Sequence, residues 1–99
     1  MKDEDSASSS VQRAFAILRA LATTQAKGGR ITHIAKATGL TQATTHRLLQ
    51  SLVAEHVVEQ DATSKLYRLS IDFFALAAQA GNSMDLRALT RASGDFVTA

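Results

Sequence analysis

Gly39 constrains the fold of this chain more than any other residue, because it separates two short helical patterns. The first pattern covers residues 33–38, with Thr32 as its capping residue, and a glycine that follows it can take the left-handed conformation that ends a helix. The second pattern covers residues 42–55 and begins after Thr41, whose hydroxyl can accept a hydrogen bond from the first helical turn. Two helices joined by a three-residue turn predict a helix-turn-helix.

A longer helix is predicted before this unit. Ser9 lies three residues before Gln12, which is the spacing of a capping box. Apolar residues then recur at helical intervals, and they are Val11, Ala14, Phe15, Leu18, Leu21 and Ala22. This helix should end before Gly28 and Gly29, and residues 1–9 are predicted to form a disordered tail.

A β-hairpin is predicted directly after the helix-turn-helix. Residues 57–60 form one strand, residues 61–65 a polar turn, and residues 66–69 the returning strand, in which Tyr67 and Leu69 share a face. A hairpin in this position is the wing of a winged helix-turn-helix.

Residues 71–99 are predicted to be helical, with one helix ending at Gly81 and a last helix beginning at Asn82 or Ser83. The predicted fold class is therefore mostly α with a small β-hairpin, a winged helix-turn-helix followed by linker helices. Beyond the tail, the predicted divisions are a winged helix-turn-helix domain over residues 10–70 and linker or dimerisation helices after it. The predicted core consists of Phe15, Leu18, Leu21, Ile34, Leu40, Leu48, Leu52, Val57, Tyr67, Leu69 and Phe73.

The charge distribution favours a polyanionic partner. The net charge is only +2, but residues 6–54 contain six basic residues and no acidic one. A segment with one sign of charge projects a positive field that attracts nucleic acid. A lightly charged, solvated surface is the alternative interpretation.

Several functional classes are disfavoured by what the sequence lacks. There is no cysteine, no apolar run long enough to cross a bilayer, and an acidic rather than basic N-terminus, which together indicate a soluble protein of the cytoplasm. The histidines His33, His46 and His56 do not have the spacing that pairs metal ligands on a helix, so neither a metal nor a cofactor is expected. No phosphate-binding glycine loop or nucleophile motif is present, and an enzyme is not expected.

The second helix of the helix-turn-helix has an outward face suited to DNA. Gln42, Thr44, Arg47 and Gln50 can bond to base edges or phosphates, and the small Ala43 permits close approach to the groove. Secondary contacts are predicted for Thr32, Thr45, His46 and Lys65. A solvated helix face, a winged helix that binds protein, and RNA binding are the alternatives, although no aromatic stacking platform supports the last.

Four segments in this order and spacing resemble the N-terminal winged helix-turn-helix domain of IclR-type bacterial transcription regulators. They cover residues 10–18, 34–40, 44–52 and 67–69. The resemblance implies a homodimer that binds double-stranded DNA at a palindromic operator, with the second helix of the motif in the major groove. It also implies a small-molecule effector that acts only through a C-terminal domain not present in this chain. Dimerisation is assigned to Val11, Phe15, Leu86 and Leu89.

Two residues depart from the usual pattern of this family. Thr41 stands where many members have proline, but it can still cap the helix. Thr45 stands where a small apolar residue is usual, and a buried hydroxyl there can bond back to the preceding turn. The chain is also short for the family, so we expect a fragment of a longer regulator in preference to a naturally short protein.

Overall fold

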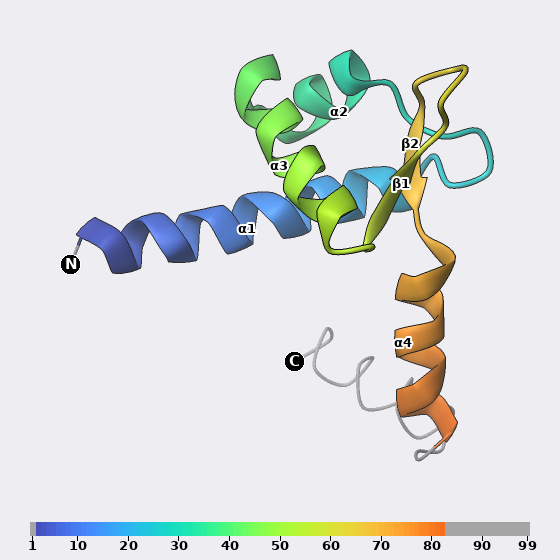
Figure 1. Cartoon of the computed structure of the whole chain (residues 1–99). Coiled ribbons are helices and arrows are strands. Elements are labelled where there is room, and N and C mark those ends of the chain that lie inside the picture. The colour runs from blue at the N-terminus through green and yellow to red at the C-terminus, as the bar shows by residue number, and fades with distance from the viewer. Residues whose placement is uncertain (1, 83–99) are drawn as a thin grey trace, which may run out of the picture.

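The computed structural model describes residues 2–82, which form four helices and one two-stranded sheet (Figure 1). The elements in chain order are α1 (Lys2–Ala22), α2 (Ile31–Thr38), α3 (Gln42–Ala54), β1 (Val58–Gln60), β2 (Tyr67–Leu69) and α4 (Ile71–Asn82). Helices α2 and α3 lie on one side of α1, and the hairpin lies beside the C-terminal end of α1 (Figure 1). The N-terminal half of α1 and most of α4 project away from this body (Figure 1). The predicted fold class, a winged helix-turn-helix, is confirmed.

One apolar core joins α1, α2, α3 and both strands. Its buried members are Ile17, Leu18, Leu21, Ile34, Leu49, Val58, Tyr67 and Leu69, and the partly buried Leu40, Leu48, Leu52, Val57 and Phe73 pack against it. Most of the predicted core is therefore present, although Ile17, Leu49 and Val58 were not included in that prediction.

The placement of Phe15 in the core was wrong. Its side chain is 50% exposed. Phe15 precedes the fully buried Ile17 by two residues, which is about 200° around a helix, so the two side chains point in opposite directions. The Arg19 guanidinium lies 6.0 Å from the centre of the Phe15 ring, at the distance of a cation–π contact.

Three helix ends differ from the sequence prediction. Helix α1 begins at Lys2, so the backbone of residues 2–9 is helical where a disordered tail was predicted, and Ser9 lies inside the helix instead of capping it. This segment contains no glycine or proline, and nothing in its sequence interrupts the helix. Helix α2 begins one residue before Thr32, and Arg30 occupies the cap position without a side-chain hydrogen bond. Helix α4 continues through Gly81.

The predicted helix-turn-helix geometry is otherwise confirmed at both sides of the turn. Gly39 has a φ of 75°, and its N–H donates to the carbonyl of Ala35. Thr41 caps α3, with its Oγ1 accepting a hydrogen bond of 3.2 Å from the N–H of Thr44. The turn therefore fixes the direction in which α3 leaves α2.

The hairpin is held to the body by the loop between α1 and α2. Strands β1 and β2 are antiparallel, with Val58 opposite Leu69. On its other edge, β2 exchanges two backbone hydrogen bonds with Gly29, of 2.7 and 2.8 Å, through Tyr67. Gln25 continues this pairing, because its side-chain amide both donates to the carbonyl and accepts from the N–H of Leu69, each at 3.0 Å.

The predicted last helix, with Leu86 and Leu89, lies outside the described residues. No helix within residues 2–82 is long and apolar enough to cross a membrane.

Candidate nucleic-acid interface

Helix α3 presents an exposed face without acidic residues. Gln42, Ala43, His46, Arg47 and Gln50 are all exposed. Between Gln42 and Ala54 the helix contains no acidic residue, and the first acid that follows is its C-terminal cap, Glu55. The face therefore offers amide, imidazole and guanidinium groups to a negatively charged partner.

Thr45 was predicted to contact DNA, and the structure contradicts this assignment. Its side chain is fully buried, at 0% exposure. The hydroxyl donates a 2.8 Å hydrogen bond to the carbonyl of Thr41, as expected for a buried threonine that bonds back to the preceding turn. Thr45 thus stabilises the start of α3 from inside, while Thr44, which is half-buried, remains at the edge of the exposed face.

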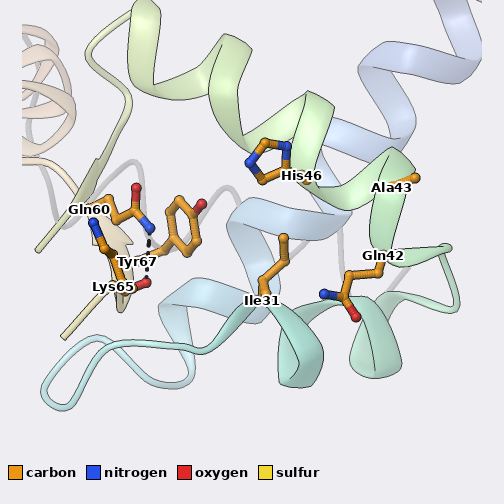
Figure 2. Close-up of a pocket in the computed structure, with 7 residues that line it drawn as sticks. All are labelled: Ile31, Gln42, Ala43, His46, Gln60, Lys65 and Tyr67. Carbon is orange, nitrogen blue, oxygen red and sulfur yellow. Dashed lines mark hydrogen bonds between the residues drawn. The ribbon is translucent and has the colours of Figure 1, made fainter. Parts of the chain in front are cut away.

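An open groove of about 550 Å³ runs between the start of α3 and the hairpin (Figure 2). It is lined by Ile31, Gln42, Ala43, His46, Gln60, Lys65 and Tyr67. The groove therefore brings together four of the predicted DNA contacts, Gln42, Ala43, His46 and Lys65. The predicted contacts Thr32, Thr44, Arg47 and Gln50 are not part of its lining.

The turn of the hairpin holds Lys65 in a defined position. Lys65 has a φ of 66°, its N–H donates to the carbonyl of Asp61 at 2.8 Å, and its carbonyl accepts from Nε2 of Gln60 at 3.1 Å. The carboxylate of Asp61 accepts from the N–H groups of Ser64, at 2.7 Å, and Thr63, at 3.1 Å. These bonds, those to Ser64 foremost, lower the pKa of Asp61 below its ordinary value of 3.8, with a smaller contribution from the charge of Arg68.

Three residues of the groove were missed by the sequence analysis as site residues. Gln60 was predicted at the end of a strand and Tyr67 in the core, and Ile31 was given no role. The alternation of β2 indicated only that Tyr67 points inward, and it gave no sign that the ring also borders a surface groove. The register that pairs Gln60 with Tyr67 across the hairpin is seen only in the structure, because the predicted turn of residues 61–65 placed Gln60 opposite Leu66.

The described residues offer no metal site. Within residues 9–81, whose side chains the structure describes, no group of three or more histidine, aspartate or glutamate side chains lies close enough together to hold a metal ion.

The helix-turn-helix, the hairpin beside it and the acid-free face of α3 define a winged helix-turn-helix DNA-binding domain. Residues 10–62 match the IclR helix-turn-helix domain family, and the chain belongs to this family. IclR proteins are transcription regulators and not enzymes, so the chain contains the DNA-binding domain of a transcription regulator.

Known relatives agree with this assignment. The chain is 37% identical over 94 residues to a glycerol operon regulatory protein of Streptomyces griseus, covering 87% of this chain and 37% of that protein. It is 35% identical over 96 residues to the glycerol operon regulatory protein of Streptomyces coelicolor, covering 89% of this chain and 37% of that protein. The chain thus spans little more than a third of the length of these relatives.

Three solved structures, two of them of IclR regulators, have the same fold. A regulator from Alicyclobacillus acidocaldarius superposes with a TM-score of 0.71 at 30% identity, over 80% of this chain and 32% of that one. HmgR of Pseudomonas aeruginosa superposes with a TM-score of 0.67 at 29% identity, over 80% of this chain and 32% of that one. An IclR regulator from Brucella abortus gives a TM-score of 0.67 at 30% identity, over 81% of this chain and 30% of that one.

Proposed function

We propose that the chain binds a palindromic operator as a homodimer, with α3 of each copy in the major groove. The observation that carries this proposal is the exposed, acid-free face of α3 that follows a firmly capped turn. Base contacts are assigned to Gln42, Thr44, Arg47 and Gln50, with Ala43 permitting close approach. Thr32, His46 and Lys65 are assigned to the periphery of the contact, where phosphates lie.

The DNA contact is tested by fluorescence anisotropy of a duplex that the chain enriches from a random-sequence library. Arg47→Ala should weaken binding by about 1–3 kcal/mol if Arg47 contacts a guanine. Arg47→Lys is the matched control, because lysine keeps the charge and loses the two-pronged geometry of the guanidinium. Recovery of affinity with lysine would assign Arg47 to a phosphate, and unchanged affinity of the alanine variant would remove it from the interface.

The homodimer is supported by apolar side chains that the described residues leave uncovered. Val11 and Phe15 on α1 are 58% and 50% exposed, and Ile71, Phe74 and Leu76 on α4 are 74%, 46% and 63% exposed. Apolar surface that gathers on projecting helices favours association. Leu86 and Leu89 are assigned to the same interface, in a linker that follows the DNA-binding domain of residues 10–70. Two-fold symmetry would place the half-sites about 34 Å apart, or a multiple of this distance.

The regulated gene and the response belong to the whole protein. Because two relatives are named glycerol operon regulatory proteins, a glycerol operon promoter is the first natural DNA to test. The family resemblance assigns any small-molecule effector to a C-terminal domain. A bacterial regulator that acts on the chromosome works in the cytoplasm, and we place this protein there.

A further inference from the structure

We propose that the groove between α3 and the hairpin binds one phosphodiester of the DNA backbone, and that the Tyr67 hydroxyl donates a hydrogen bond to it. This inference rests on the proposed function and adds to it a specific site, a specific ligand group and a residue not otherwise assigned to DNA.

Tyr67 combines a buried ring with a polar group that has no protein partner in the described part of the chain. The residue is only 3% exposed and its ring belongs to the core. No hydrogen bond joins its hydroxyl to another residue in the lining of the groove, and Figure 2 shows the hydroxyl directed toward the His46 side. Within the described residues, every side-chain oxygen or nitrogen that is itself buried has a hydrogen-bond partner. Because the Tyr67 hydroxyl has none, its oxygen is not buried with the ring and is accessible from the groove that the residue lines. A phenol held in this way is a fixed donor whose ring cannot turn aside.

The other polar residues of the groove suit an anion. Lys65 and Gln60 come from the hairpin and His46 and Gln42 from α3, and each can donate a hydrogen bond (Figure 2). No acidic residue is among those that line the groove in residues 2–82. Hydrogen bonds from such donors to phosphate oxygens are charge-assisted and stronger than bonds between neutral groups.

A second hollow beside the same hairpin makes the contrast clear. It is lined by Glu59, Gln60, Asp61, Ala62 and Arg68. Its two carboxylates outnumber the single guanidinium, so its net negative charge would repel a phosphate. The hairpin therefore has one surface suited to the DNA backbone and one that is not. The surface suited to DNA faces α3.

The position of the groove also matches the path of a DNA strand. With α3 in the major groove, the strand that borders that groove must pass beside the helix toward the wing. The groove between α3 and the hairpin is the space that this strand would enter. Since phosphate contacts fix the register of a protein on DNA, Tyr67 would act on the position of α3 as well as on affinity.

The test uses the duplex enriched from a random library, prepared with a single neutral methylphosphonate at each backbone position in turn. The unmodified chain should lose about tenfold in affinity at one or more positions of each half-site, as expected for a lost hydrogen bond to a charged group. Tyr67→Phe removes only the hydroxyl. It should bind the unmodified duplex about tenfold more weakly than the unmodified chain does. A methylphosphonate at one of the sensitive positions should then reduce the affinity of Tyr67→Phe by less than about threefold, because the contact is already absent.

Two further variants separate this site from a general loss of charge or of folding. Lys65→Gln changes an exposed side chain. Its affinity should no longer fall when a methylphosphonate is placed at the same or an adjacent backbone position. Lys27→Gln serves as the matched control, because Lys27 lines a different hollow, and it should keep the profile of the unmodified chain. Thermal unfolding of Tyr67→Phe tests whether its fold is intact.

Identical profiles for the unmodified chain, Tyr67→Phe and Lys65→Gln would overturn the phosphate site while leaving DNA binding in place. If the chain enriches and retains no duplex, the proposed function itself fails and this inference fails with it.

Discussion

At the scale of the residue, Gly39 shows how one backbone conformation sets the angle of the helix-turn-helix. Its φ of 75° is strained for any residue with a Cβ atom, although an added Cβ would meet no other atom within 4 Å. Gly39→Ala should therefore destabilise the fold by about 1–2 kcal/mol through backbone strain alone. Urea unfolding measures this loss. Gly39→Asn is the matched control and should lose less, since asparagine tolerates the left-handed conformation better, and equal losses would contradict the explanation.

Asp61 organises the turn that carries Lys65, and its effect on stability should depend on pH. Since the folded state lowers its pKa, the contribution of Asp61 is fully present above its ordinary pKa of 3.8 and is lost as the pH falls through the lower pKa of the folded state. Asp61→Asn should be less stable than the unmodified chain at neutral pH, and the difference should shrink below about pH 4. Urea unfolding across a pH series provides the measurement. A difference that stays constant with pH would show that the charge of Asp61 does not stabilise the turn.

At the scale of the element, the hairpin depends on contacts that are distant in sequence. Gln25 lies 44 residues before Leu69, yet it makes two hydrogen bonds to the backbone of that residue. Gly28 approaches β2 so closely that a Cβ atom there would lie 3.0 Å from the Cβ of Leu66. The loop between α1 and α2 therefore holds the hairpin in place from its outer edge.

Gln25→Ala should release β2 from this loop. It leaves two backbone groups of Leu69 without partners, at a cost of about 1–3 kcal/mol for each group that stays buried. Faster hydrogen exchange of the Leu69 amide is the expected observation. Gln25→Glu is the matched control, because a carboxylate can still accept from the N–H of Leu69 but cannot donate to its carbonyl, and it should have an intermediate effect. An exchange rate that neither variant changes would mean that Gln25 does not anchor the hairpin.

The elements were predictable from the sequence where a local rule fixes them. Thr41 and Gly39 act through neighbours within one helical turn, and both were identified correctly. Ser70 caps α4 by the same local rule, since its Oγ accepts from the N–H of Phe73, but this cap was not predicted. The distant bond that its hydroxyl donates to the carbonyl of His56 could not be read from the sequence. Thr32 was predicted as the cap of α2 by the same local rule, but Arg30 occupies that position. The backbone just before the helix is fixed by the pairing of Gly29 with Tyr67.

The candidate site was predictable only in part, for a similar reason. The face of α3 depends on helical periodicity, which the sequence shows directly, and the burial of Thr45 already follows from its place beside Leu49 on the inner face. The groove depends on how far the hairpin stands from α3, which the sequence does not show. Tyr67 could therefore be assigned to the core from its strand pattern, but not to the surface that its hydroxyl reaches.

At the scale of the whole molecule, the two projecting helices are the candidates for association between copies. Phe74→Glu places a charge on the exposed apolar face of α4 and should weaken dimers without unfolding the domain, because Phe74 is 46% exposed and is not part of the core. Sedimentation velocity over a range of concentrations measures the effect. Gln79→Glu, which adds the same charge at an exposed position of the same helix, is the matched control. A dimer fraction that Phe74→Glu leaves unchanged would exclude this face of α4 from the interface.

The central claim is that α3 and the hairpin together bind duplex DNA. An amide-resolved NMR titration with a mixed-sequence duplex at low salt tests it most directly. We expect shifts centred on residues 42–50 and on the turn of residues 61–65, and these shifts should fade as salt rises because phosphate contacts release counterions. The absence of shifts, or shifts confined to α1 and α4, would contradict the account and favour a winged helix that binds protein.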